Sequence, residues 1–280
     1  MWSLIERYIN ECPFIILLET FSSISHFQKP SDDSWSVVRY RKMLLAVVIF
    51  RFIEIQKTIP FIFKFMNTYI FIHGGESFSH EKEYEEFISK TLVNWNLEAF
   101  REEESRKKWK IELAKKLTSS GSRVYLPNFP NSMNAKYNEW KIFFEKWIEK
   151  VEIVGNIIFI GNSLGGCFLL RYFSEDDLKI HTNTIHSIHL VATCLSAGDF
   201  KEGENYYFLK KLKENIFIWH AEDDTVVPIS DAKKLSEILP DGQKILFPKE
   251  KGYGHFYAIE EFKEIEKILL FPGSPPLCEI

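Results

Sequence analysis

The segment GNSLGG, residues 161–166, places a serine at the centre of a glycine-rich turn. The run IIFI before it has the composition of a buried strand, and the small apolar residues after it favour a buried helix. A serine at such a junction needs glycine neighbours, because the tight turn brings the strand and helix backbones close together. The turn would expose the hydroxyl of Ser163 as a candidate nucleophile, although glycine-flanked serines also occur in ordinary loops.

A serine hydroxyl is a weak nucleophile and needs a neighbouring base to accept its proton. The sequence has eight histidines, and His255 in the segment KGYGHF is the candidate base, because it follows the last expected strand in a loop that contains glycine. His186 and His189 fall within an expected strand, which favours a structural role. His73 ends the first expected strand, where its backbone matters more than its ring.

The base must be held in the correct tautomer by a third group, normally a carboxylate. The segment AEDDTVVP offers Glu222, Asp223 and Asp224 at the end of another expected strand. Alone, an acidic triplet is typical of a solvated turn. Here the chain order is serine, then acid, then histidine, each after a separate strand, which is the order found in α/β hydrolases.

Strands and helices alternate from about residue 66 onward. Strands are expected at 68–73, 123–126, 157–160, 185–192, 216–220 and 244–247, and helices at 81–93, 100–117, 137–151, 204–215, 230–239 and 259–270. Ser230 is expected to cap its helix, and Phe262, Ile265 and Leu269 to form one apolar stripe of the last helix.

This alternation predicts an α/β fold, a three-layer α/β/α sandwich with a mostly parallel central sheet and no large lid domain. In such sheets ligands bind beyond the carboxyl ends of the strands. His73, Ser163, Cys194 and Asp224 each follow a strand and should lie at that edge.

The composition excludes some partners. Lysine and arginine total 35 against 39 acidic residues, a net charge of −4, so no basic field attracts nucleic acid. The four cysteines form no CxxC pair and no histidine stands at metal-ligand spacing. We therefore expect free thiols in a reducing, cytoplasmic compartment and no metal.

Residues 1–65 differ from the rest, and we divide the chain into an N-terminal extension, 1–65, and a domain, 66–280, with the strand–helix pattern expected of an α/β hydrolase. The extension has no apolar run near the ~20 residues that a spanning helix needs. Glu6 and Glu11 are unlike a signal peptide. Three interpretations stay open: a packed helical extension, a weak membrane-surface anchor, or sequence upstream of a natural start at Met66, which opens directly into a strand.

From about Met66 to Leu270 the sequence resembles the α/β hydrolases, and in detail the small serine hydrolases of the retinoblastoma-binding protein 9 / YdeN type. The resemblance is carried by FIHGG, PNFPNSMNAKYNEW, IGNSLGG, HAEDDTVVP and GYGHF, and it does not extend to residues 1–65. It implies that Ser163 is the nucleophile and His255 the base. The acid of this family stands four residues before the proline, which selects Asp224 over Asp223.

The resemblance also implies a binding site around the nucleophile. The backbone N–H groups of Leu164 and Gly75 would form the oxyanion hole. His73, Gly74 and Asn162 would belong to the substrate-binding site, the first two by shaping the oxyanion loop. Asn162 stands where the family often has histidine, a departure expected to alter the rim of the site rather than the mechanism.

These features predict a serine hydrolase that cleaves a small ester-like acyl substrate through an acyl-enzyme, without metal or organic cofactor. An acyltransferase with the same triad and a protein-binding module on a hydrolase scaffold are the alternatives. The segment SAGDFKEGENYYFLKKLKEN is too short for a large lid, so we expect an open pocket. Tyr206, Tyr207 and Phe208 line this pocket unless they form the packed face of a helix.

Overall fold

The computed structural model describes residues 66–94, 108–201, 203 and 205–270. The chain divides into two units, Met1–Lys64 and Phe65–Ile280, and every described residue belongs to the second. The expected extension, residues 1–65, therefore lies outside the described residues, as does the expected start of the helix at 100–107.

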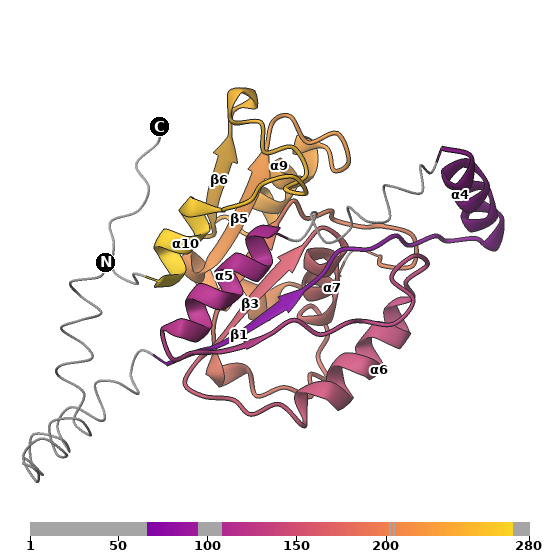
Figure 1. The fold of residues 1–280 in the computed structure, drawn as a ribbon. Coiled ribbons are helices and arrows are strands. Elements are labelled where there is room, and N and C mark those ends of the chain that lie inside the picture. Colours follow the sequence, from indigo (N-terminus) through magenta and orange to yellow (C-terminus); the bar gives the residue numbers. More distant parts are fainter. Residues whose placement is uncertain (1–65, 95–107, 202, 204, 271–280) are drawn as a thin grey trace, which may run out of the picture. The chain divides into compact units, whose positions relative to one another are not determined.

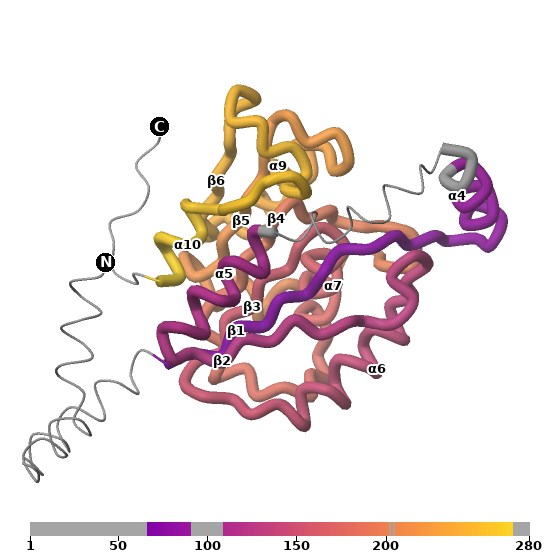
Figure 2. The backbone as a smooth tube through the Cα atoms, in the orientation of Figure 1, coloured from indigo at the N-terminus to yellow at the C-terminus, as the bar shows by residue number. Residues whose placement is uncertain are grey.

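A six-stranded parallel sheet in the order β2-β1-β3-β4-β5-β6 is the centre of the described residues (Figures 1 and 2). Its strands are β1 (Thr68–Ile72), β2 (Arg123–Tyr125), β3 (Ile157–Asn162), β4 (Ile185–Val191), β5 (Ile216–Ala221) and β6 (Gln243–Phe247). The expected α/β sandwich is confirmed, and the described sheet is parallel throughout. Each strand ends within two residues of its expected bounds.

Helices connect the strands. They are α4 (Glu81–Asn94), α5 (Lys108–Ser119), α6 (Tyr137–Ile148), α7 (Leu164–Tyr172), α8 (Tyr207–Leu212), α9 (Ile229–Ile238) and α10 (Lys263–Leu270), with 3₁₀ turns η3 (Thr182–Thr184), η4 (Lys213–Asn215) and η5 (Lys249–Lys251). All of these α-helices except α4 pack against one or other face of the sheet (Figure 1). Among the described residues, we find no helix with the length and apolar character needed to cross a bilayer.

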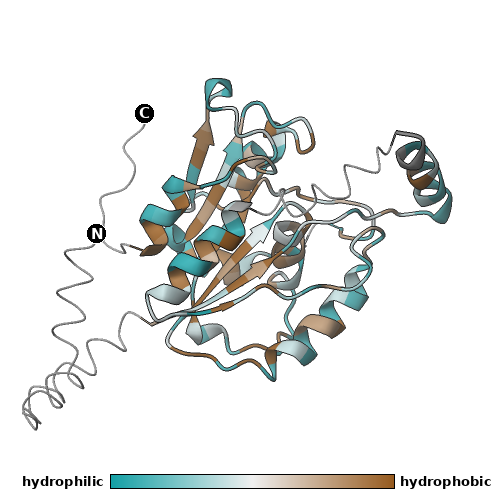
Figure 3. Cartoon of the chain, in the orientation of Figure 1, coloured by the Kyte–Doolittle hydropathy of each residue, from teal (hydrophilic) through white to brown (hydrophobic). Residues whose placement is uncertain are grey.

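The two faces of the sheet form separate apolar cores, because successive side chains of a strand point to opposite sides. Ile70 of β1 packs in the core that α6, α7, α8 and α9 cover, and the next residue, Phe71, packs in the core beneath α5 and α10. Figure 1 shows α5 and α10 in front of the sheet and α7 behind it. In Figure 3 the strands are mostly brown, whereas the helices carry brown and teal on different sides.

Helix starts depart from expectation at three places. Helix α8 begins at Tyr207 rather than residue 204. Helix α9 begins at Ile229 after Pro228, so Ser230 lies inside its first turn and does not cap it. The ring of Pro228 holds φ at −67° with an extended ψ of 143°, and its carbonyl already accepts the N–H of Asp231. Helix α10 begins at Lys263 rather than residue 259, although the stripe of Ile265 and Leu269 is buried as expected.

The strand order places a switch point between β1 and β3. From β1 the chain adds β2 on one side, then returns to add β3 on the other. Ligands of open α/β sheets bind at the carboxyl ends of the strands where the order reverses. Gly74 follows β1 and Ser163 follows β3, so both lie at the carboxyl edge of the sheet, at the point where the strand order reverses.

Candidate active site

Ser163 occupies a strained turn between β3 and α7. Its φ of 55° and ψ of −123° are rarely adopted by a residue with a side chain, and such strain typically costs about 1–3 kcal/mol. The Ser163 N–H donates to the carbonyl of Val191 at 2.8 Å, which ties the turn to the end of β4. Gly165 makes the close approach possible, since a Cβ added there would lie 2.6 Å from the carbonyl oxygen of His73.

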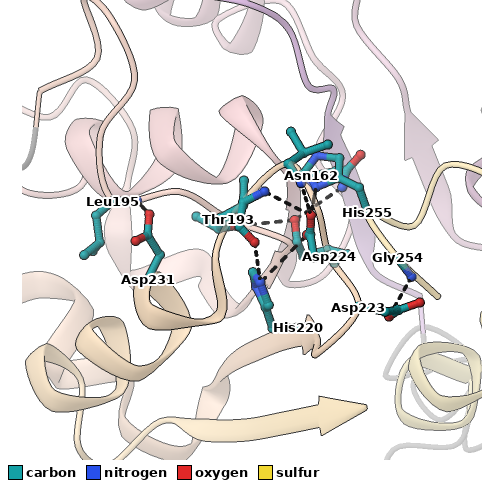
Figure 4. Close-up of polar contacts among 12 residues, drawn as sticks. Asn162, Thr193, Leu195, His220, Asp223, Asp224, Asp231, Gly254 and His255 are labelled. Atoms are coloured by element: carbon teal, nitrogen blue, oxygen red, sulfur yellow. Dashed lines mark hydrogen bonds and ion pairs between the residues drawn. The ribbon is translucent and has the colours of Figure 1, made fainter. Parts of the chain in front are cut away.

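Asp224 and His255 form a hydrogen-bonded pair beyond β5 and β6. The Nδ1 atom of His255 lies 2.8 Å and 3.0 Å from the two carboxylate oxygens of Asp224 (Figure 4). One of these oxygens also accepts the backbone N–H groups of Val226, at 2.8 Å, and Val227, at 2.9 Å. The carboxylate is thus held by its own turn and presented to the histidine.

These contacts decide the protonation of the pair. Burial alone would raise the pKa of Asp224, but the hydrogen bonds from His255 and from the Val227 and Val226 N–H groups outweigh it and lower that pKa. An ionised Asp224 only accepts, so Nδ1 of His255 carries the proton. Nε2 of His255 is buried and makes no hydrogen bond to the described residues, which leaves its lone pair available for a proton. Serine–histidine bonds are often long before substrate binds.

A second histidine lies near the acid without competing for it. His220 Nε2 donates to the carbonyl of Val227 at 3.0 Å and lies 3.8 Å from Asp224. Burial lowers the pKa of His220, so its ring is neutral. His255 is therefore the histidine that Asp224 binds through its carboxylate.

The loop after β1 lies against the serine turn. A Cβ added at Gly74 would lie 3.1 Å from Cβ and 3.6 Å from Oγ of Ser163, and one added at Gly75 would lie 3.5 Å from Cδ2 of Leu164. Within the described residues, neither the Gly75 N–H nor the Leu164 N–H donates a hydrogen bond. An oxyanion hole requires unused backbone donors next to the nucleophile, so these two N–H groups remain the candidates for it.

The side chains of His73 and Asn162 hold backbone in place. Nε2 of His73 accepts the N–H of Phe129 at 2.9 Å, so its proton is on Nδ1, which donates to the carbonyl of Gly74 at 2.6 Å. Asn162 is 1% exposed and donates to the carbonyl of Val191. The structure thus places Asn162 beneath the turn rather than on the rim, because the last side chain of β3 points into the protein.

The side chains that are expected to react have little exposed surface: Ser163 is 7% exposed and His255 is 5% exposed. Phe208 packs on Phe173 at the end of α7 far from Ser163, and the Tyr206 hydroxyl accepts the N–H of Gly203. Tyr206 and Phe208 are therefore packed, as in the second of the two interpretations, whereas Tyr207 is 64% exposed.

Sequence reasoning missed three residues that contact the catalytic segments. Asp223 accepts the N–H of Gly254 at 3.0 Å. In α5, Trp109 donates a hydrogen bond to Phe256, and Lys110 donates one to Asn162. Asp223 was visible as a second acid, but nothing in the sequence indicated its partner.

Within the described ranges, no group of three or more His, Cys, Asp or Glu residues could hold a metal ion. Cys167 and Cys194 are buried free thiols, and Cys12 and Cys278 lie outside the described residues.

The parallel sheet, the strained serine turn at its carboxyl edge and the acid–histidine pair after later strands define the fold of the α/β-hydrolase superfamily. Among solved structures, the chain is similar to the ydeN gene product from B. subtilis, with 18% identity, a TM-score of 0.52, and coverage of 73% of this chain and 97% of that chain. At this identity the likeness shows the shared fold.

Two further structures are similar at lower scores. A predicted CIB-like hydrolase from Thermoplasma acidophilum has 16% identity and a TM-score of 0.43, covering 73% of this chain and 85% of that chain. Est1E from Butyrivibrio proteoclasticus has 12% identity and a TM-score of 0.43, covering 74% and 86%. These scores are too low to add to the first likeness. No protein-family model matches the sequence, and no curated protein matches it.

Proposed function

We propose that this protein is a serine hydrolase that cleaves a small ester-like substrate through an acyl-enzyme intermediate. The observation that carries the proposal is the hydrogen-bonded Asp224–His255 pair with Nε2 of His255 unbonded, at the same sheet edge as the strained Ser163. A neutral imidazole whose tautomer is set by a carboxylate is the base that a serine hydroxyl needs.

The proposed reaction has two proton-coupled halves. Oγ of Ser163 attacks the carbonyl carbon while its proton passes to Nε2 of His255, and the new imidazolium is stabilised by Asp224. The same proton then passes to the leaving alcohol, whose departure produces the acyl-enzyme. Water gives its proton to Nε2 and attacks the acyl carbon, and the proton returns to Oγ as the acid product leaves.

The oxyanion of each tetrahedral intermediate would be held by the N–H groups of Leu164 and Gly75. Removing one such donor typically costs about 3 kcal/mol of transition-state stabilisation. The loop after β1 therefore matters almost as much to the proposed reaction as the triad. The closeness of Gly74 to Ser163 supports this placement.

Hydrolysis of p-nitrophenyl esters of increasing acyl length tests the proposal. We expect the unaltered protein to turn over short esters, and Ser163→Ala and His255→Ala to lose about 10³-fold or more in kcat. Circular dichroism and urea unfolding should show that both variants fold. A folded, unaltered protein that hydrolyses no ester would contradict the proposal and favour a binding module on this scaffold.

A further inference from the structure

Trp109 and Lys110, two consecutive residues of α5, bind the two segments that carry the reacting groups. Trp109 Nε1 donates to the carbonyl of Phe256 at 3.0 Å, and Lys110 Nζ donates to Oδ1 of Asn162 at 2.5 Å. Phe256 directly follows His255, and Asn162 directly precedes Ser163. One helical turn therefore joins the histidine loop to the serine turn.

The partners of Asn162 fix the orientation of its amide. A lysine ammonium only donates, so the oxygen of the amide faces Lys110. The amide nitrogen donates to the carbonyl of Val191 at 3.3 Å, and the same carbonyl accepts the Ser163 N–H at 2.8 Å. Lys110, Asn162 and Val191 thus form a continuous chain of hydrogen bonds that ends on the backbone of the nucleophile.

We propose that Lys110 is a positioning residue for catalysis, which through Asn162 holds the Ser163 turn at a fixed distance from the histidine loop anchored by Trp109. This inference rests on the proposed function, because it assigns the contact a role in the reaction of Ser163. Displacing a reacting atom by about 1 Å can slow a reaction by about 10²-fold, so a contact one residue from the nucleophile has a large effect on rate. Lys110 does not touch the substrate in this account.

Steady-state hydrolysis of p-nitrophenyl acetate by the full chain provides the test. Lys110→Met keeps the length of the side chain but removes the charge and the donor. We expect kcat to fall about tenfold, the effect of losing a charge-assisted hydrogen bond, with KM within about twofold of its original value. Lys110→Arg, which keeps the charge and the donor, should recover kcat to within about threefold of the unaltered protein.

Two further variants separate positioning from general effects of charge. Lys115→Met is the matched control, because Lys115 is an exposed lysine of the same helix paired with Glu112 at 2.6 Å, and it should leave kcat unchanged. Asn162→Leu should lower kcat as Lys110→Met does. Adding Lys110→Met to Asn162→Leu should lower it no further, since Lys110 acts through Asn162. Urea unfolding of each variant establishes that it is folded.

The possible failures are distinguishable. If the unaltered protein hydrolyses the ester and folded Lys110→Met has the same kcat, the inference is overturned and the proposed function stands. If the two substitutions reduce kcat independently and additively, Lys110 does not act through Asn162 and the inference is likewise wrong. If the folded, unaltered protein has no activity, the proposed function fails and the inference fails with it.

Discussion

The carboxylate of Asp223 accepts the backbone N–H of Gly254 at 3.0 Å (Figure 4). Its neighbour Asp224 binds the side chain of the next residue, His255. Two consecutive acids after β5 therefore hold two consecutive residues of the histidine loop. One acid holds the loop by its backbone, and the other sets the tautomer of the imidazole.

This division predicts unequal effects for two matched substitutions. Asp224→Asn should lower kcat by about 10⁴-fold, because an amide can donate to Nδ1 and so hold the wrong tautomer. Asp223→Asn should lower kcat by about tenfold or less, since the amide oxygen can still accept the Gly254 N–H. Ester hydrolysis measured on both folded variants decides the matter. Equal losses would refute the assignment of Asp224 as the catalytic acid.

Gly165 and Gly74 should respond differently to the same added methyl group. Gly165→Ala would place Cβ 2.6 Å from the backbone oxygen of His73, which cannot easily move, so we expect a loss of about 3 kcal/mol in the free energy of unfolding. At Gly74 the added Cβ would lie 3.1 Å from Cβ of Ser163, and we expect mainly a loss of kcat. Urea unfolding and ester hydrolysis of both variants test this contrast, which equal stabilities would contradict.

Glu76 should make the site discriminate against anionic substrates. It follows the oxyanion loop, its N–H donates to the carbonyl of Ser132, and burial raises the pKa of its carboxyl group, an effect that His255 partly offsets. A charge pair about 5 Å apart near a protein surface interacts by about 1–3 kcal/mol. Glu76→Gln should therefore raise kcat/KM for an ester with a terminal carboxylate several-fold relative to the neutral ester of equal length. An unchanged ratio would show that Glu76 does not face the substrate.

His189 should make the stability of the fold depend on pH. Its Nδ1 accepts the Trp219 Nε1–H at 3.2 Å, and burial, with a smaller effect of His186, lowers the pKa of His189 to about 3 from 6.5. The unfolded chain then binds a proton that the folded chain excludes. Above pH 6.5 both states leave His189 neutral, and the free energy of unfolding does not depend on it. As the pH falls from 6.5 toward 3, protonation of the unfolded chain lowers the free energy of unfolding, by about 2–3 kcal/mol at pH 4.5.

Urea unfolding at pH 7 and pH 4.5 checks this prediction. His189→Gln, which keeps an acceptor for Trp219, should lose less stability between the two pH values than the unaltered protein. His186→Gln is the control, because His186 is exposed on the same strand and should leave the difference nearly unchanged. Identical losses in all three proteins would contradict a neutral, buried His189.

The sequence was sufficient to predict the strands and the order of the candidate triad, because both depend on local patterns. A continuous apolar run such as IIFI is typical of a strand whose two sides are both buried in a parallel sheet. A GxSxG segment after such a strand is typical of a sharp strand-to-helix turn. Helix starts were harder to predict, because Pro228 and Ser230 offer competing local signals and the backbone of the preceding loop decides between them.

The contacts of Asp223 and Lys110 could not be predicted for a different reason. Asp223 meets Gly254 and Lys110 meets Asn162 across 31 and 52 residues of chain, and the sequence contains no signal for either pairing. Residues that position a site through the backbone of other segments become visible only in three dimensions.

Labelling with a fluorophosphonate, followed by peptide mass spectrometry, tests the central claim most directly. A fluorophosphonate phosphonylates a serine whose hydroxyl is activated by a base and whose oxyanion is stabilised. We predict a single adduct on the peptide that contains Ser163, no adduct in Ser163→Ala, and a strongly reduced rate in His255→Ala. A folded, unaltered protein that gains no adduct, or gains it on another residue, would contradict the account.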